Sequence, residues 1–360
     1  MHSYGGGAEK ICLSLAKSLT PERFTVTLGC LYAIEALRAP FQDFARPIMP
    51  ASRGFKEKCK NMYTLWRTAR RSDCVIGSLE LQSVFWAALL APHKAIGWLH
   101  KDLQGYCAQK PLWFRSIYLR LFAWCVRRCV CIVCASEGVR ESTQQLFPAL
   151  RDSFVHIRNP VEIQALQQAA TLPMPDILHP TFQHAVILSV GRLVPQKAYQ
   201  HLICAHALLR QRGYQHHLCI LGEGPERPRL EALCRSLGVE DTVLLPGFMP
   251  PYSAMRQARV FALSSDFEGL SLVIVEALAL GLPVVSTDCP SGPREVLQDG
   301  AHGDLVPVAD PEALAVALGR YVAANAPPPD PRRIAQGQKR ADEFDIRHCL
   351  QHWEILLRRF

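Results

Sequence analysis

Residues 264–300 read SSDFEGLSLVIVEALALGLPVVSTDCPSGPREVLQDG, and their pattern indicates both local structure and a ligand site. Its apolar run stops at Gly281, and a strand-like segment, 283–286, follows. The pattern predicts a loop, a helix with a glycine stop and a buried parallel strand. Glu268 lies in the predicted loop, and Glu276, eight positions later, lies inside the predicted helix.

The start of this predicted helix offers a site for an anion. The N–H groups of Leu270 and Ser271 would open the helix unpaired, at the positive end of its dipole. Two carboxylates that can accept hydrogen bonds from hydroxyls flank that site. A ligand with sugars on either side of a diphosphate suits this arrangement, so we expect a nucleotide sugar.

The segment EGLSLVIVE resembles the E-x7-E signature of the retaining glycosyltransferases of family 4, which have the GT-B fold. An isolated signature would be weak, but four further blocks follow the family's order: GRLVPQK (191–197), LGEGPER (221–227), LLPGF (244–248) and TDCPSGPREVLQDG (287–300). The N-terminal half is more loosely similar, through GGGAEK (5–10), WLHKDL (98–103) and CASEGV (134–139).

The resemblance implies an α/β protein of two Rossmann-like domains, each with a doubly wound parallel sheet, and an interdomain cleft. The domains would be an acceptor-binding domain, 1–160, and a nucleotide-sugar-binding domain, 161–330, and a helix in 331–360 would cross back to the first. The length of 360 residues suffices for two domains. A content of 49% hydrophobic and 20% charged residues is typical of a globular protein.

Positive charge is concentrated in the first half of the chain. Residues 1–170 hold 22 Lys and Arg against 12 Asp and Glu, a net of +10, whereas the remaining residues hold 18 against 20, a net of −2. This asymmetry favours an anionic membrane surface or a phosphorylated acceptor over a merely solvated basic face. No apolar run is long enough to span a bilayer, and the N-terminus lacks an apolar signal core. We therefore expect a cytoplasmic protein bound peripherally to the inner face of the membrane.

The segment 111–128, PLWFRSIYLRLFAWCVRR, interleaves aromatic residues with arginines. It fits either an interfacial helix on anionic lipid or a helix packed on the sheet with its arginines in water. The fourteen cysteines fall mostly inside apolar runs and fit small buried hydrophobes in a reducing compartment. Cys131 and Cys134 form one CxxC, which no second ligand pair completes as a metal site.

Gly5, Gly6 and Gly7 supply a glycine-rich turn before a helix, as in an acceptor or phosphate loop. Only four residues precede them, so the apolar strand that family members place there is missing. Either the true start lies upstream or the chain has lost a core strand, and we favour the former.

Farther on, strands are expected at 24–31, 74–78, 94–99 and 130–135, with helices between them. This alternation predicts a parallel sheet whose sites lie beyond the strand C-termini. His100 falls at such an end. The resemblance implies that it lies near the donor sugar, and the alternative is an ordinary loop histidine.

In the second half, Gly191 and Arg192 end a strand, and Lys197 follows in the loop. By resemblance the two cations neutralise the donor diphosphate, as a leaving diphosphate requires. Family members usually have Gly after the lysine. This chain has Ala198, which is tolerable if the backbone there is not left-handed.

The resemblance also implies residues that bind the rest of the donor. Glu268 would hold hydroxyls of the sugar, Glu276 would hold the ribose, and the backbone near Phe248 and Met249 would meet the base. The remaining donor-binding positions are Gly222, Glu223, Gly269, Leu270 and Ser271. Family members usually carry Pro at position 271, and Ser271 leaves an N–H available for the phosphate.

The expected reaction is retaining transfer of a hexose or N-acetylhexosamine from a nucleotide sugar, with a UDP-sugar favoured, to a glycan or lipid-linked acceptor in cell-envelope polysaccharide synthesis. No Asp-x-Asp pair occurs, which favours charge stabilisation without a metal, and no cofactor is expected. The main alternative is a degenerate, non-catalytic GT-B protein at a membrane. An epimerase or phosphorylase would lack these donor blocks, and a nucleic-acid binder would need a motif that is not found.

Overall fold

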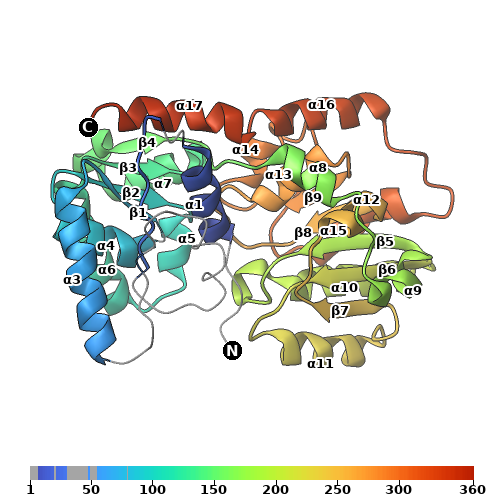
Figure 1. Ribbon diagram of the computed structural model, residues 1–360. Helices are drawn as coiled ribbons and strands as arrows, with labels where there is room; N and C mark the ends of the chain where they lie inside the picture. The colour runs from blue at the N-terminus through green and yellow to red at the C-terminus, as the bar shows by residue number, and fades with distance from the viewer. Residues whose placement is uncertain (1–6, 20–21, 31–47, 49–54, 79) are drawn as a thin grey trace. The chain divides into compact units, whose positions relative to one another are not determined.

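The computed structural model describes residues 7–19, 22–30, 48, 55–78 and 80–360 (Figure 1). The chain divides into two compact units, Met1–Pro160 with Ile346–Phe360, and Val161–Asp345. In both units the strands named below are parallel and alternate with helices. None of the helices in the described ranges has the length and apolarity needed to span a bilayer.

The first unit is built on a sheet with the strand order β1-β2-β3-β4. Its core packs around Phe122, Ile132 and Leu99, all fully buried. Cys131 and Cys134 are buried in β3 beside that core. The elements, in chain order, are α1 (Gly7–Ser18), α3 (Phe55–Arg71), β1 (Val75–Ser78), α4 (Glu80–Leu90), β2 (Ala95–Leu99), α5 (Leu103–Ala108), α6 (Leu112–Arg128), β3 (Cys131–Cys134), α7 (Glu137–Leu146), β4 (Phe154–His156) and α17 (Ile346–Leu357).

Two predictions concern the N-terminal region. Gly7 opens α1, whereas Gly5 and Gly6, and any strand before them, lie outside the described residues. The strand expected at 24–31 is not present in the part that the structure describes, because only Gly29 forms a β-bridge there, to Ile48. An isolated β-bridge is not a strand, so the prediction of a strand at 24–31 was wrong.

The second unit is built on a sheet with the order β10-β9-β8-β5-β6-β7. After β5 the chain adds β6 and β7 on one side and then β8, β9 and β10 on the other, so the order reverses between β5 and β8. The elements are α8 (Ile163–Ala169), α9 (His179–Phe182), β5 (Ala185–Val190), α10 (Tyr199–Gln211), β6 (His216–Leu221), α11 (Arg227–Leu237), β7 (Val243–Gly247), α12 (Tyr252–Gln257), β8 (Val260–Leu263), α13 (Leu272–Ala279), β9 (Val284–Thr287), α14 (Pro293–Val296), β10 (Asp304–Val306), α15 (Pro311–Val322) and α16 (Pro331–Asp342).

Helix α13 follows the sequence pattern closely at its C-terminus. Gly281 adopts φ 73°, and the Leu282 N–H donates to the Ala277 carbonyl at 3.0 Å, which closes the helix and turns the chain into β9. The N-terminus differs from the prediction. Ser271 adopts φ 56° and ψ 58°, outside the helical region, so α13 begins at Leu272.

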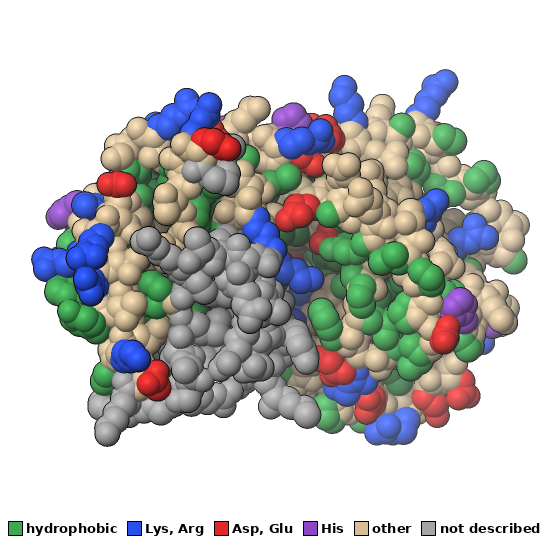
Figure 2. Space-filling view, in the orientation of Figure 1, with side chains coloured by type: hydrophobic (Ala, Val, Ile, Leu, Met, Phe, Trp, Pro, Cys, Tyr) green, Lys and Arg blue, Asp and Glu red, His purple; other side chains and the backbone are tan. Residues whose placement is uncertain are grey.

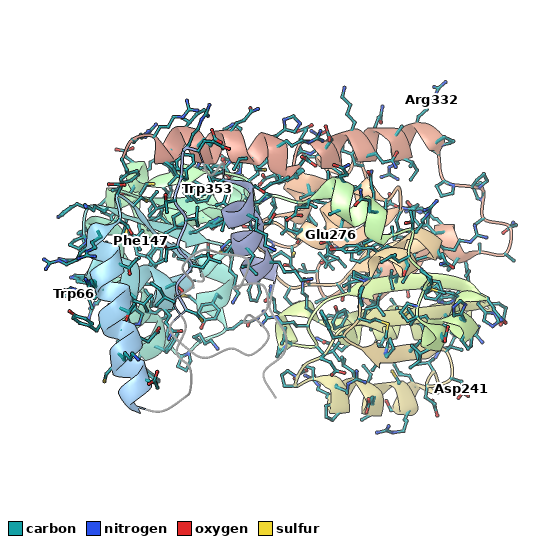
Figure 3. All side chains as sticks on the ribbon, viewed as in Figure 1. Trp66, Phe147, Asp241, Glu276, Arg332 and Trp353 are labelled. Carbon is teal, nitrogen blue, oxygen red and sulfur yellow. The ribbon has the colours of Figure 1, made fainter. Side chains whose placement is uncertain are left out.

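The closing segment forms two helices where the sequence favoured one from Arg332 to Arg359. Between α16 and α17 the Phe344 carbonyl accepts from the Val161 N–H at 2.9 Å, and the Phe344 ring is fully buried. This anchor interrupts the helix. Helix α17 carries Trp353 (Figure 3) and packs within the first unit. The Trp353 ring lies 4.5 Å from that of Trp98.

Candidate active site

The reversal of strand order between β5 and β8 positions the candidate site in the second unit. In open parallel sheets, ligands bind beyond the carboxyl ends of the strands at such a point. The loop after β5 carries Arg192 and Lys197, and the loop after β8 carries Glu268. The loops are joined by the Ser264 hydroxyl, which donates to the Lys197 carbonyl at 2.9 Å, and by the Gln196 amide, which donates to the Phe267 carbonyl at 2.9 Å.

An ion pair occupies the centre of this site. Lys197 Nζ lies 2.6 Å from Glu268 Oε1, with the side chains 15% and 8% exposed. The same carboxylate oxygen accepts a hydrogen bond of 2.6 Å from the Ser265 hydroxyl. The Thr287 hydroxyl in turn donates to the Ser265 carbonyl at 2.7 Å. Because Ser265 and Thr287 are fully buried, they hold Glu268 in a fixed position.

Arg192 and Ala198 belong to the same segment after β5 as Lys197. The Arg192 side chain is exposed, and the described residues supply no carboxylate to pair with it, so its charge is available to a ligand. Ala198 has φ 47° and ψ 39°, which is the left-handed conformation. The condition under which Ala would replace Gly without strain is therefore not met, and a Cβ in this region costs about 1–2 kcal/mol.

Glycines let the loops after β5 and β6 approach each other closely. A Cβ on Gly222 would lie 1.8 Å from the Gly191 carbonyl oxygen, and one on Gly224 would lie 2.2 Å from the Leu193 carbonyl oxygen. The Leu193 N–H donates to the Glu223 carbonyl at 2.9 Å across this contact. No side chain fits between these backbones, so the close packing of the two loops requires glycine at positions 222 and 224.

Arg227, at the start of α11, holds the loop that contains Glu223. Its guanidinium donates to both carboxylate oxygens of Glu223, at 2.6 and 3.0 Å, and to the Leu245 carbonyl at 2.9 Å. The pKa of Glu223 is lowered by the hydrogen bond from Arg227. Just beyond β7, Phe248 is 57% exposed and Met249 packs partly into the core.

The N-terminus of α13 lies beside Glu268 in the chain and has donors to offer. No protein acceptor is found within the described ranges for the N–H groups of Leu272 and Val273, as is usual for a first helical turn. The Ser271 hydroxyl is buried and has no partner in the described part of the chain. Gly269 and Leu270 precede it, and a Cβ on Gly292 would lie 2.6 Å from the Gly269 carbonyl oxygen.

Glu276 lies one turn farther along α13 (Figure 3). Its Oε1 accepts a hydrogen bond of 3.2 Å from the Tyr252 hydroxyl on α12. Burial and the nearby carboxylate raise the pKa of Tyr252, so the phenol remains protonated and can donate. Tyr252 thus orients the Glu276 carboxylate, a group of the kind that accepts hydrogen bonds from hydroxyls.

His100 lies in the first unit, directly after β2. Its Nδ1 is 3.1 Å from Asn159 Nδ2, its Nε2 is 3.1 Å from Ser78 Oγ, and its ring centre is 4.7 Å from that of Trp98. Burial, with a smaller contribution from Lys101, lowers the pKa of His100 to about 3. The imidazole is therefore neutral at physiological pH.

Comparisons with known proteins identify the family. Residues 5–165 match the family model of Glycosyltransferase Family 4, and residues 180–340 match that of the glycosyl transferases group 1. This chain belongs to the family 4 glycosyltransferases. Its fold is GT-B, and it is similar to the crystal structure of the Anabaena protein HepE in complex with UDP-glucose. That similarity has a TM-score of 0.79 at 20% identity and covers 100% of this chain and 98% of HepE.

Two relatives each match nearly half of the chain. The N-acetylgalactosamine-N,N'-diacetylbacillosaminyl-diphospho-undecaprenol 4-alpha-N-acetylgalactosaminyltransferase of Campylobacter jejuni is 37% identical over 174 residues, 48% of this chain and 45% of the relative. The lipopolysaccharide 1,6-galactosyltransferase of Salmonella typhimurium is 31% identical over 177 residues, 47% of this chain and 46% of the relative. The matched part thus spans less than half the length of these relatives.

Several residues that shape the site were missed by the sequence reasoning. Ser265 and Tyr252 orient the two glutamates, and Arg227 holds the loop of Glu223. Ser265 lies three positions before Glu268, a spacing that could have suggested a local contact. Tyr252 carries no such signal, because its partner is 24 positions away.

Proposed function

We propose that this glycosyltransferase moves a hexose or N-acetylhexosamine from a UDP-sugar to an acceptor hydroxyl, with retention of anomeric configuration and without a metal. The observation that carries the proposal is the group at the strand-order reversal. There, the loop after β5 carries the exposed Arg192 and also Lys197, which forms a buried pair with Glu268 of the loop after β8. The first N–H groups of α13, shortly after Glu268 in the chain, have no protein acceptor among the described residues. Fixed cations and N–H donors suit a diphosphate on which negative charge develops as it leaves.

The ion pair implies an exchange of partners when the donor binds. Lys197 would turn from Glu268 to the diphosphate, and Glu268 would then accept a hydrogen bond from a sugar hydroxyl. The Ser265 hydroxyl keeps Glu268 oriented during this exchange. Glu276, held by Tyr252, would accept from the ribose. Each charged group thus has a partner both before and after the donor binds, which limits the cost of burial.

A transfer assay tests this proposal. The protein would be incubated with UDP-glucose, UDP-galactose, UDP-N-acetylglucosamine or UDP-N-acetylgalactosamine and a membrane extract, and release of UDP and sugar incorporation would be followed. Proton NMR of the product gives the anomeric configuration. An α-linked product from an α-linked donor supports retention, and a β-linked product would contradict it. Chelation of divalent metals should leave the rate unchanged.

For the acceptor, we propose a lipid-linked oligosaccharide or lipopolysaccharide. Support comes from the named activities of the Campylobacter and Salmonella relatives, which concern a diphospho-undecaprenol-linked glycan and a lipopolysaccharide. Extraction of the labelled product into organic solvent or the lipopolysaccharide fraction distinguishes the two. A labelled product found only in a water-soluble fraction would exclude both.

We also propose that the first unit binds an anionic membrane through α6 and its neighbours. The inner face of α6 packs in the core, through Phe122 and Cys125, while its outer face exposes Trp113 by 67% and Ile117 by 59%. Arg120 lies on the same outer face. The helix therefore packs on the unit, as one of the two alternatives raised by its sequence requires, and it also presents the apolar and basic face on which the membrane proposal depends.

Helix α3 also exposes aromatic and basic side chains. It is connected to α6 through α4, which contacts both. Tyr63 and Trp66 on α3 are 60% and 38% exposed, and the Arg70 guanidinium lies 5.0 Å from the Trp66 ring centre. Figure 2 shows Lys and Arg side chains beside hydrophobic ones along the left edge, where Figure 1 places α3. Aromatic side chains with arginines suit the headgroup region of anionic lipid.

Vesicle flotation tests the membrane proposal. We expect binding to phosphatidylglycerol vesicles and little binding to phosphatidylcholine. Trp113→Ser with Ile117→Ser should weaken binding at least about tenfold, because each exposed side chain would bury apolar area worth more than about 1 kcal/mol. Val316→Ser, which changes an apolar side chain 52% exposed on α15, is the matched control and should bind as the unmodified protein does. Equal loss in both variants would contradict the assignment.

A further inference from the structure

A chain of hydrogen bonds in the first unit determines which nitrogen of His100 carries the proton. It begins at Trp98, whose indole Nε1–H can only donate and lies 3.1 Å from Asn159 Oδ1. The Asn159 oxygen is therefore directed at the indole, and its NH2 group is directed at His100 Nδ1, 3.1 Å away. Asn159 is 2% exposed and Trp98 is 1% exposed, so water does not compete for these positions.

An NH2 group can only donate, so His100 Nδ1 must offer a lone pair. A neutral imidazole carries one proton, and that proton is then on Nε2. The Nε2–H faces Ser78 Oγ at 3.1 Å, and this hydroxyl can accept. If the Asn159 amide were turned over, its oxygen would face Nδ1 and stabilise an imidazolium, but Trp98 Nε1–H would then meet an NH2 group.

We propose that Trp98 and Asn159 are positioning residues that hold His100 as the Nε2–H tautomer, so that His100 takes part in transfer as a neutral hydrogen-bond donor and not as a proton acceptor. The assignment of the tautomer rests on geometry alone. Its role in transfer rests on the proposed function.

The surroundings of His100 agree with a neutral donor. Burial lowers the pKa of His100 and the positive charge of Lys101 adds to this, while the hydrogen bond with Asn159 acts in the opposite direction and is outweighed. The single Nε2–H is directed at Ser78 Oγ in this structure, so a hydroxyl oxygen of the sugar, or an oxygen that gains negative charge, would share or replace that acceptor. His100 cannot remove a proton through Nε2, and Nδ1 is covered by Asn159.

Nitrogen-15 NMR of the histidine side chains in the full chain tests the tautomer directly. His100→Gln identifies the His100 signals. We expect Nε2 to resonate as a protonated nitrogen and Nδ1 as an unprotonated one, with no titration between pH 8 and pH 5. A signal of protonated Nδ1, or a titration near the ordinary value for histidine, would overturn the proposal.

Two variants test the positioning role. Asn159→Asp places a carboxylate oxygen at Nδ1, so Nδ1 should become protonated and the titration midpoint should rise by about 1–3 pH units. Trp98→Phe removes the donor that orients the Asn159 amide, so a second population with protonated Nδ1 should appear. If either folded variant keeps the tautomer of the unmodified chain, the residue changed does not position His100.

The kinetic measurement separates this inference from the proposed function. In a working transfer assay, Asn159→Asp should lower kcat more than it changes KM, and its pH profile should gain an ionisation at the midpoint seen by NMR. An unchanged pH profile would overturn the role in transfer. If the unmodified chain transfers no sugar while NMR shows the Nε2–H tautomer, the proposed function fails and the tautomer assignment stands.

Discussion

At Ser271, a left-handed backbone and a buried hydroxyl without a protein partner in the described chain occur in one residue. The backbone costs about 1–2 kcal/mol, and the hydroxyl about 1–3 kcal/mol. Ser271→Gly removes both costs. The greater freedom of glycine in the unfolded chain offsets about 0.4–1 kcal/mol of this gain in stability. We expect it to raise the free energy of unfolding by at least about 1 kcal/mol, measured by urea denaturation.

Ser271→Pro should do the opposite. Proline fixes φ near −65°, which is incompatible with the observed φ of 56°, so the free energy of unfolding should fall by about 3 kcal/mol or more. Relatives with Pro at this position would then need a different local backbone. A Pro variant as stable as the unmodified chain would show that the left-handed conformation is wrong.

Lys197 and Glu268 form a buried ion pair, so each side chain depends on the other. Removing one partner leaves the other charge buried, so Lys197→Met and Glu268→Gln should each lower the free energy of unfolding by about 3 kcal/mol. The double variant should cost less than the sum, by at least about 1 kcal/mol in a double-mutant cycle. Strict additivity would mean that the two groups do not interact in solution.

Among the elements, the packing of the loops after β5 and β6 depends on the absence of side chains. Gly222→Ala would place Cβ 1.8 Å from the Gly191 carbonyl oxygen, so the loops must separate. We expect the free energy of unfolding to fall by several kcal/mol and UDP binding to be lost. Gly213→Ala is the control. Its φ is 86° but nothing lies within 4 Å, so it should cost only about 1 kcal/mol of strain. Equal effects would contradict the close approach.

Sequence patterns predicted those elements whose boundaries are encoded locally. The apolar run and Gly281 fixed the C-terminus of α13, and β9 followed as expected. The start of α13 was misplaced because nothing in the residue type of Ser271 signals a left-handed backbone. The single closing helix was wrong for a different reason. Phe344 leaves the helix to enter the core, and its carbonyl bonds Val161, a contact remote in sequence.

Residue types within the site were easier to predict than their partners. The two glutamates and the cations stand in motifs, whereas Tyr252 reaches Glu276 from another helix and Asn159 reaches His100 from 59 positions away. Such pairs depend on how strands are ordered in the sheet. The order β8-β5-β6 is what brings the loop of Lys197 to the loop of Glu268, and no local pattern encodes it.

For the whole molecule, buried neutral histidines predict sensitivity to acid. Burial lowers the pKa of each of four histidines, His100, His156, His206 and His216. The unfolded chain binds these protons near pH 6.5 and the folded chain does not, so stability is lost as the pH falls below that value. Each contributes up to about 1.4 kcal/mol per pH unit.

We therefore expect the free energy of unfolding to fall steeply between pH 7 and pH 5, above the range in which most carboxylates titrate. His216→Gln should make this slope shallower by about one histidine's contribution, measured by urea denaturation at each pH. A flat profile over this range would show that these histidines are accessible to protons in the folded state.

Thermal unfolding with UDP, GDP and ADP in turn tests whether a donor site lies at the reversal of strand order. UDP at about a hundred times its dissociation constant should add about 2.7 kcal/mol and raise the midpoint by about 5–10 °C. Arg192→Ala should lose most of this shift, whereas Arg259→Ala, at the opposite end of β8, should keep it. A shift with GDP or ADP alone would mean that the donor carries that nucleotide and not UDP. A cooperative unfolding transition whose midpoint no nucleotide raises would contradict the donor site.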